Sequence, residues 1–159
     1  MNTTSELENK LWSALSSHRV VMLGLDSEGG ASRPMTVQME EPRGPLWFFT
    51  AKESSLVQGM SVPNRATATF VAKGGELFAT IEGPIVVDDD KANIDRLWNR
   101  HVAVWYPDGK NDPHLALLRL EPANVHIWSN DASVMSGFKV LMGADPRKEQ
   151  VGSEARVRL

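Results

Sequence analysis

Short β-strand patterns follow one another closely along most of this chain, and their spacing constrains the fold more than any other feature of the sequence. Turn sequences such as Asp26–Gly30 and Lys73–Gly75 separate them, as in antiparallel hairpins, and a last hairpin is expected around Glu121-Pro122. Gly83-Pro84 lies inside a longer pattern, where it indicates a bulge or a sharp bend of the kind that closes a barrel. The sequence therefore predicts a mainly β protein, an antiparallel barrel with peripheral helices. The expected strands cover Arg19–Leu25, Ser32–Met39, Leu46–Thr50, Ala66–Ala72, Glu76–Val87, Leu115–Leu120, Asn124–Trp128 and, at the end of the chain, Ala155–Leu159.

Three helices are expected beside the strands. The first begins at Thr3 or Ser5, since either residue forms a capping box with a glutamate three residues later. The segment Thr50–Glu53 is another capping box, and it predicts a short helix that ends near Met60. The third helix covers Asp88–Asn99, because aspartates in a first turn interact favourably with the helix dipole.

Composition excludes several classes of function. The net charge of −3 provides no basic field for nucleic acid, and the absence of cysteine excludes disulfides, thiolate metal sites and thiol nucleophiles. No apolar stretch approaches the roughly 20 residues of a membrane span, and the polar start of the chain has no signal-peptide pattern. We therefore expect a cytoplasmic protein without membrane or nucleic-acid partners. It should form one domain over residues 1–159, with a polar and weakly patterned tail from about residue 143.

Common catalytic and metal-binding motifs are absent. The four histidines, His18, His101, His114 and His126, occur at no metal-ligand spacing, so no metal site is expected. The sequence also lacks a nucleophile elbow, a dinucleotide-binding glycine motif and a phosphate-binding loop. Hydrolase, Rossmann dehydrogenase and nucleotide triphosphatase functions therefore lose their main support.

One local cluster suits a phosphate group. Thr50, Lys52, Ser54 and Ser55 lie where an aromatic strand leads into the start of a predicted helix. The first N–H groups of a helix are unpaired and carry partial positive charge, which Lys52 and the hydroxyl groups would strengthen. The alternative is an ordinary capped helix, which is a common arrangement.

The positions of the tryptophans also indicate a ligand or an interface. Strand alternation places Trp128 on the face opposite Val125 and Ile127, so Trp128 points outward if those two residues face the core. An outward tryptophan is typical of an interface or a ligand wall; the alternative is packing beneath the first helix or the tail. Trp105 and Tyr106, beside a turn, either wall a planar ligand or pack internally.

A specific order of short motifs covers roughly residues 5–130. Together they resemble the general stress protein 26 group of the pyridoxamine 5′-phosphate oxidase-like, flavin-binding split-barrel superfamily. This resemblance implies a six-stranded antiparallel split β-barrel that binds FMN, or FAD in its place. It also implies a homodimer with two flavin sites at the interface. The motifs are Ser32-Arg33-Pro34-Met35, Leu46-Trp47-Phe48-Phe49-Thr50, Gly83-Pro84, Leu97-Trp98-Asn99, Trp105-Tyr106-Pro107-Asp108-Gly109, Asp112-Pro113 and Ile127-Trp128.

The resemblance also implies which residues contact the flavin. It places Arg33 near the phosphate and ribityl chain, the following strand beside the flavin ring, and the strand end at Phe49-Thr50 against the phosphate. Trp105 and Trp128 would border the cleft. No residue is a convincing acid or base, so catalytic residues stay unassigned. With the local phosphate cluster, the expected cofactor-binding set is Arg33, Pro34, Met35, Thr36, Gln38, Phe49, Thr50, Lys52, Ser54, Ser55, Trp105 and Trp128.

Two departures from the family pattern concern positive charge. Relatives commonly carry a basic residue where this chain has Ser54-Ser55-Leu56, and the true oxidase has a lysine where this chain has Gln38. Charge-assisted hydrogen bonds are the strong ones, so the departures predict weaker retention of the flavin. The substrate signature of the oxidase is not evident near the C-terminus, and pyridoxamine phosphate oxidation is therefore not expected.

Three functions remain open from the sequence. The first is a general stress protein that acts as a flavin-dependent oxidoreductase on a small-molecule substrate, with the flavin supplying the chemistry. The second is a non-catalytic flavin-binding stress sensor or flavin reservoir. The third is a structural dimer whose cleft has lost its ligand.

Overall fold

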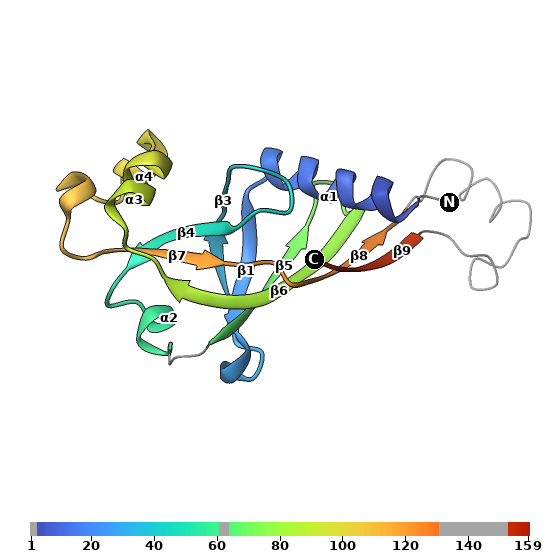
Figure 1. Ribbon diagram of the computed structural model, residues 1–159, viewed down its shortest axis with the longest axis horizontal. Helices are drawn as coiled ribbons and strands as arrows, with labels where there is room; N and C mark the ends of the chain where they lie inside the picture. The colour runs from blue at the N-terminus through green and yellow to red at the C-terminus, as the bar shows by residue number, and fades with distance from the viewer. Residues whose placement is uncertain (1–2, 61–63, 131–152) are drawn as a thin grey trace, which may run out of the picture.

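One antiparallel sheet connects the strands of the computed structural model, which describes residues 3–60, 64–130 and 153–159 (Figure 1). The strands are β1 (Val20–Leu25), β2 (Arg33–Thr36), β3 (Gln38–Met39), β4 (Leu46–Ala51), β5 (Arg65–Val71), β6 (Leu77–Val87), β7 (Leu115–Leu120), β8 (Asn124–Ser129) and β9 (Ser153–Arg158). The helices are α1 (Thr4–Ser17), α2 (Ser55–Gln58), α3 (Lys91–Leu97) and α4 (Arg100–Ala103), with short 3-10 helices η1 (Asp26–Glu28) and η2 (Gly109–Asn111). The expected mainly β class is confirmed, although the described residues contain nine strands where the sequence pattern indicated eight and the resemblance implied six.

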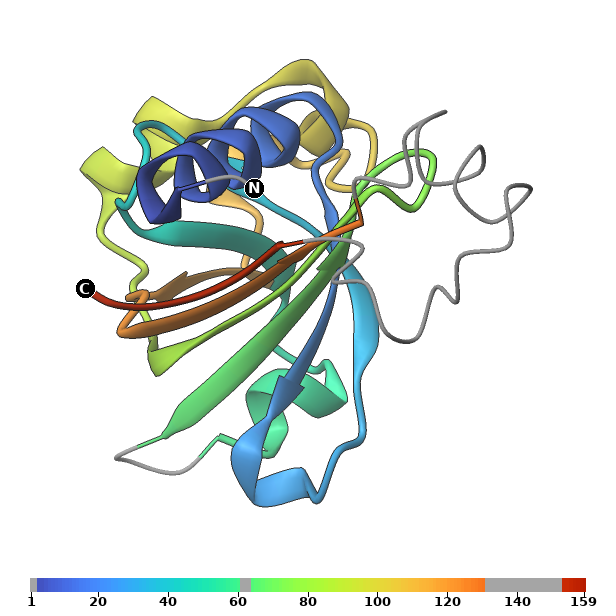
Figure 2. The ribbon, with the colours of Figure 1, turned by 90° about the vertical axis from the view of Figure 1, so that its right-hand side faces the viewer.

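The sheet curls until its two ends meet. Hydrogen bonds connect the strands in the order β2-β1-β5-β6-β7-β4-β3, and the first and last strands of this order are consecutive in the chain. Val37 lies between them, fully buried, and its N–H donates to the carbonyl oxygen of Arg19 at 2.6 Å. The result is a nearly closed barrel, and Figure 2 shows the strands wrapped around one interior.

Strand β6 pairs with different partners along its length. Its first part, Leu77–Glu82, pairs with β8, and its last part, Ile85–Val87, pairs with β7. The expected hairpin of β7 with β8 around Glu121-Pro122 is therefore wrong, because both strands pair with β6 and not with each other. The expected hairpins of β1 with β2 and of β5 with β6 are confirmed.

The link from β7 to β8 passes directly over Gly83, which explains the bend in β6. The N–H of Glu121 donates to the carbonyl oxygen of Pro84 at 2.9 Å, and the N–H of Ala123 donates to that of Glu82 at 2.8 Å. A Cβ atom on Gly83 would lie 1.8 Å from the carbonyl oxygen of Glu121. Glycine is therefore required at this position for close approach of two backbones.

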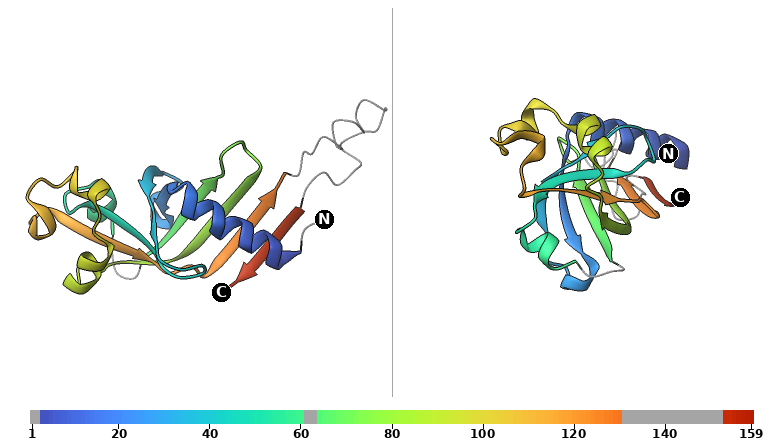
Figure 3. Two further views of the ribbon diagram at one scale, coloured as in Figure 1. Left: turned by 90° about the horizontal axis from the view of Figure 1, so that it is seen from above. Right: turned by 60° about the vertical axis from the view of Figure 1, so that its left-hand side comes forward.

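Two apolar clusters hold the helices to the sheet. The main cluster fills the barrel, and α1 contributes to it while lying along β8 and β9 (Figure 3). The smaller cluster lies on the other side of β4 and β7 and attaches α3 to the outside of the barrel. The buried residues of α1 are Leu7, Leu11, Trp12 and Leu15, and the smaller cluster consists of Trp47, Ile94, Leu97, Leu115 and Leu117.

The local start signals for helices are confirmed at α1 and wrong at α2. Thr3 forms the expected capping box at the start of α1. The expected box over Thr50–Glu53 does not form, because pairing with β7 extends strand β4 through Ala51. Instead Ser54 caps α2, and its side chain accepts a hydrogen bond from the N–H of Val57.

The third expected helix is shorter than the sequence indicated. The segment predicted as one helix over Asp88–Asn99 contains α3 only, and Asn99 then caps the separate helix α4. The terminal strand expected at Ala155–Leu159 is present as β9, which pairs with β8, while residues 143–152 of the tail lie outside the described residues. No helix among the described residues is long and apolar enough to cross a membrane.

Replacement of Gly83 by alanine should lower the stability of the barrel. The added methyl group would meet the backbone of Glu121, which moves only if the link between β7 and β8 moves. Overpacking of this kind costs about 1–3 kcal/mol. We expect a lower midpoint in urea unfolding monitored by tryptophan fluorescence, and an unchanged midpoint would contradict the close crossing.

Candidate functional site

A pocket of about 390 Å³ opens where β2 and β3 meet the end of β4 and helix α4. Three chain segments that are far apart in the sequence line it, because closure of the barrel brings the two ends of the sheet together. Its volume lies within the usual range of small-molecule sites. The lining residues are Pro34, Met35, Thr36, Gln38, Phe49, Thr50, His101, Val102, Trp105 and Tyr106.

This pocket collects seven of the twelve residues expected to contact a flavin. Strand alternation in β2 exposes Pro34 and Thr36 on one face and turns Met35 toward the core cluster. Phe49 and Thr50 come from the end of β4, where the burial of the strand decreases. The seven residues are Pro34, Met35, Thr36, Gln38, Phe49, Thr50 and Trp105.

Aromatic side chains hold one wall of the pocket in place. The ring of Phe49 packs edge-on against Trp98, with ring centroids 6.0 Å apart, and Trp98 contacts Tyr106 at 6.4 Å. Trp105 is 79% exposed at the rim. Burial, with a smaller contribution from Asp112, raises the pKa of Tyr106, so this residue presents a neutral hydroxyl group at pH 7.

The floor of the pocket contains a buried amide. Gln38 is only 8% exposed, and its Oε1 accepts a hydrogen bond from Nδ2 of Asn99 at 3.1 Å. Asn99 also caps α4, so the floor and the α4 wall meet at this residue.

Of the residues expected at the phosphate, Phe49 and Thr50 line the pocket, whereas Arg33, Lys52, Ser54 and Ser55 do not. Arg33 forms an ion pair with Glu28, with its Nη2 atom 2.9 Å from Oε2 and its Nη1 atom 3.3 Å from Oε1. Lys52 and Ser55 are exposed, and the hydroxyl group of Ser54 is engaged as the cap of α2. Ser54 at this turn is thus a helix cap, and phosphate binding by the cluster stays a prediction.

Trp128 does not line the pocket of its own chain. It is 37% exposed on the outer face of β8, as strand alternation predicted, and its ring stacks on His126 with centroids 3.7 Å apart. Along the sheet, β2 and β8 are separated by four strand-to-strand steps, through β1, β5 and β6. Trp105 and Trp128 therefore border different regions of one protomer.

Two lining residues were not identified from the sequence. His101 and Val102 lie on α4, which was included in a longer predicted helix. Asparagine is a favoured capping residue, so Asn99 was the signal that could have placed a new helix start two residues before His101.

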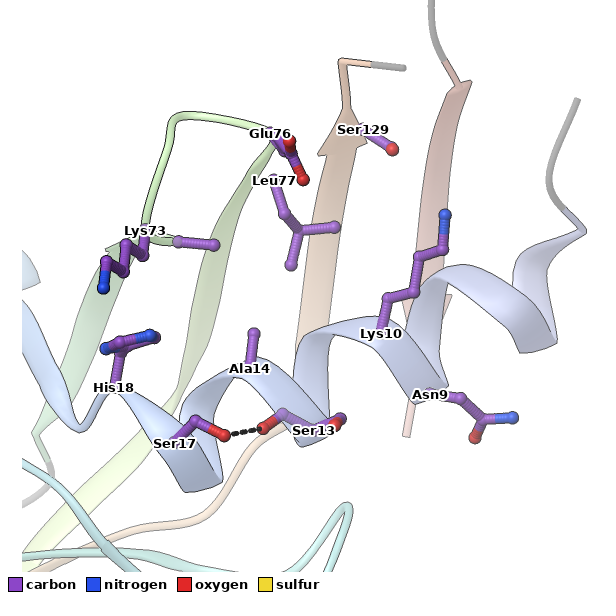
Figure 4. A pocket seen from close by; sticks show the side chains of 11 residues that line it. Asn9, Lys10, Ser13, Ala14, Ser17, His18, Lys73, Glu76, Leu77 and Ser129 are labelled. Carbon is purple, nitrogen blue, oxygen red and sulfur yellow. Dashed lines mark hydrogen bonds between the residues drawn. The ribbon is translucent and has the colours of Figure 1, made fainter. Parts of the chain in front are cut away.

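A larger hollow of about 690 Å³ lies between α1 and the β5–β6 hairpin (Figure 4). Most of its lining side chains are exposed and polar, among them Lys10, His18 and Lys73. Ser17 donates a hydrogen bond to the backbone of Ser13 within α1, and this contact serves the helix itself. The described residues contain no group of side chains that could hold a metal ion.

Comparison with known proteins identifies the class. A model of the family described as pyridoxamine 5′-phosphate oxidase like matches residues 6–149 of the chain. The chain therefore belongs to the pyridoxamine 5′-phosphate oxidase-like family, and the expected split-barrel fold is confirmed.

Its relatives include several general stress proteins. A general stress family protein of Xanthomonas campestris pv. campestris is 49% identical, with a TM-score of 0.77 over 84% of this chain and 93% of that chain. The general stress FMN/FAD binding protein of Xanthomonas citri is 50% identical, with a TM-score of 0.76 over 82% of this chain and 93% of that chain. General stress protein 26 of Bacillus subtilis (strain 168) is 20% identical over 129 residues, which cover 78% of this chain and 89% of that protein.

One ion pair near the pocket should respond to pH. Nδ1 of His114 lies 2.6 Å from Oε1 of Glu53, and this contact raises the pKa of His114 and lowers the pKa of Glu53. The raised histidine pKa stabilises the fold below the unfolded value of about 6.5, and that contribution is lost as pH rises through the folded pKa. The lowered glutamate pKa stabilises the fold above about 4.3, and that contribution is lost as pH falls.

The pair should therefore contribute mainly between these two unfolded pKa values. In an NMR titration, Glu53→Gln should return the pKa of His114 toward about 6.5. The stability difference between variant and wild type should shrink at alkaline pH. Identical His114 titration curves in the two proteins would contradict the pairing.

Proposed function

We propose that this chain is a general stress protein that binds FMN in the pocket between β2, β3, β4 and α4. The observation that carries the proposal is the pocket itself, in which the edge of the Pro34–Gln38 segment meets Phe49, Thr50 and Trp105. The 50% identical protein of Xanthomonas citri, which binds FMN or FAD, supports a flavin as the ligand.

The side chains of the pocket fit a flat heterocycle with polar edges. Phe49, Trp105 and Tyr106 supply aromatic surface, and such surface packs well against planar rings. Gln38, Thr36 and Thr50 supply hydrogen-bonding groups. Few charged groups line the pocket, which suits the neutral oxidised ring of a flavin.

The phosphate of FMN would lie beyond the pocket, toward Arg33, Lys52, Ser54 and Ser55. Arg33 supplies a guanidinium group suited to phosphate, but Glu28 already pairs with it. Phosphate and carboxylate would therefore compete for the same donors. This competition supports modest selectivity for FMN over riboflavin.

Bound flavin would supply hydride or electron transfer, and the protein would bind and orient it. We propose oxidoreductase activity on a small molecule as the function of the loaded protein. Near the ring, Tyr106 would donate a hydrogen bond in its neutral form, and His101 is the other titratable residue that lines the pocket. The alternative, a flavin reservoir or sensor, would show no oxidation of NADH or NADPH with an electron acceptor present.

Flavin titration tests the proposed ligand and the position of its phosphate. Wild-type protein should quench FMN fluorescence on binding. Arg33→Ala should weaken FMN binding by about one to two decades, because a charged hydrogen bond contributes about 1.5–3 kcal/mol. Glu28→Gln is the matched variant, and it should tighten FMN binding by releasing Arg33. Riboflavin, which lacks the phosphate, should respond little to either change.

The outcomes separate the two parts of this proposal. Failure of the wild type to bind FMN would contradict the proposed function. Equal effects of Arg33→Ala on FMN and riboflavin would contradict only the position of the phosphate.

We further propose that the protein is a homodimer whose flavin sites lie at the interface. A band of exposed apolar side chains crosses the outer face of the sheet from β1 to β8. Its members are paired across neighbouring strands, Val71 opposite Phe78 and Phe78 opposite Trp128. An exposed apolar surface of this kind marks an interaction site. The band consists of Val20 (58% exposed), Met22 (41%), Val71 (54%), Phe78 (38%) and Trp128 (37%).

A second copy of the chain fits this band for a geometric reason. The pocket residues Pro34 and Thr36 lie opposite Met22 and Val20, so the pocket is at one end of the band, and Trp128 is at the other. A two-fold axis through the middle of the band would bring each Trp128 toward the pocket of the other protomer. Such a dimer would give Trp128 the ligand contact that it cannot make within its own chain.

The dimer has a direct test with a matched control. Val71→Lys should convert the protein to its monomer mass of 17.6 kDa in analytical ultracentrifugation at micromolar concentration. Val87→Lys, at a similarly exposed position outside the band, should leave the dimer intact. Trp128→Ala should weaken flavin binding although the residue does not line the pocket of its own chain. A monomeric wild type would contradict the assembly.

A further inference from the structure

We infer that Asn99 is a positioning residue that makes Gln38 present an N–H donor to the pocket, so that the site selects a ligand with a hydrogen-bond acceptor at that point. The inference deepens the proposed flavin function and rests on it for the identity of the ligand. It depends on the hydrogen bonds of Asn99, which leave one orientation for each of the two side-chain amides.

The hydrogen bonds of Asn99 decide its own orientation. Its Oδ1 accepts from the N–H of His101 at 3.0 Å and from the N–H of Val102 at 3.2 Å, which caps α4. Its Nδ2 donates to the carbonyl oxygen of Leu97 at 3.2 Å and to Oε1 of Gln38 at 3.1 Å. An asparagine amide has two donor hydrogens and one acceptor oxygen, and all are used here. The reversed orientation would place Oδ1 against the Leu97 carbonyl and remove both capping bonds.

The orientation of Asn99 decides that of Gln38. Since Asn99 offers a donor, Gln38 must offer its acceptor, Oε1, and its Nε2 then faces elsewhere. Among the described residues no hydrogen bond is recorded from Nε2 of Gln38. Gln38 is more than nine-tenths buried, and the surface that it keeps lines the pocket.

Nε2 is open to the pocket and not sealed from solvent. A ligand that displaces solvent from this donor must offer an acceptor in its place, because a donor left unpaired inside a complex is costly. The matching group is a carbonyl oxygen or an unprotonated ring nitrogen on a planar heterocycle, and flavin rings carry such groups. A ligand that presented an N–H to Gln38 would leave two donors facing each other. Asn99 thus couples the cap of α4, which leads to Trp105 and Tyr106, to the polarity of the pocket floor.

The test uses two substitutions, and each should replace the donor that Gln38 presents to the pocket by an oxygen acceptor. Asn99→Asp keeps an oxygen for the α4 cap but removes the donor, so Gln38 should rotate, donate to Asp and present Oε1 to the pocket. Gln38→Glu leaves Asn99 unchanged and also presents an oxygen. Both variants should weaken riboflavin binding about tenfold, the range expected for one hydrogen bond. Riboflavin is the probe because its affinity is free of phosphate effects.

The double variant Asn99→Asp with Gln38→Lys separates positioning from loss of structure. The lysine ammonium group has three donors, so it can pair with Asp and still donate to the pocket. The affinity for riboflavin should recover to within about threefold of the wild type. If Asn99→Asp weakened binding only by loosening the α4 wall, the added lysine would not restore the affinity. Asn111→Asp, an exposed change of the same charge in the nearby loop, should bind riboflavin like the wild type.

Each outcome supports or overturns the inference. Unchanged riboflavin affinity in Asn99→Asp, or no recovery in the double variant, would overturn it. If the wild type binds no flavin, the proposed function fails, and NMR of the ligand-free protein still decides the orientation. The Nε2 protons of Gln38 should give cross-peaks to pocket side chains such as Phe49 in the wild type and lose them in Asn99→Asp. The reverse pattern would overturn the inference independently of any ligand.

Discussion

The closure of the sheet at Val37 is the constraint on which the rest of the structure depends. Strands β2 and β3 stand at opposite ends of the strand order, yet only this buried residue separates them in the chain. The two edge strands of an open sheet present unpaired backbone groups, and closure reduces this exposure. Pro34 and Thr36 precede Val37 in the chain, and Gln38 follows it. Closure at Val37 therefore brings the last residues of β2 and the start of β3 to the same pocket. The pocket therefore exists because the barrel closes where it does.

The polarity of the site follows from contacts that neutralise its charges. Arg33, beside the pocket, is paired with Glu28, and the buried floor residue Gln38 carries no charge. Side chains on the pocket itself are aromatic, aliphatic, hydroxyl or amide groups, apart from the imidazole of His101. Such a lining favours a neutral ring system over a highly charged ligand. Hydrogen-bond direction, decided at Asn99, then matters more for recognition than net charge does.

The relation of the pocket to the outer face of the sheet connects ligand binding with assembly. Pro34 and Thr36 belong both to the pocket and to the face that carries the exposed apolar band. Burial of such a band is favourable at roughly 25 cal/mol per Å² of apolar surface. A partner that covers the band would also enclose the pocket from one side. Dimerisation and flavin retention would then be linked energetically.

The sequence by itself determined the features that depend on neighbours a few residues apart. Alternation along 124–128 predicted the outward Trp128, Thr3 predicted the cap of α1, and Gly83-Pro84 predicted the bend in β6. Each follows from the period of a strand, the unpaired N–H groups of a helix start, or the absence of a side chain. The family resemblance added the lining segments around Pro34, Phe49 and Trp105.

Only the tertiary structure decided which segments meet. Strand β8 pairs with β6 and not with β7, because the link between them crosses over Gly83. Helix α2 begins after Ser54 and not at Thr50, because pairing with β7 extends β4. Glu28 pairs with Arg33, and Asn99 meets Gln38 across 61 positions of the chain. These contacts depend on the packing of distant strands, and no local pattern of residues specifies such packing.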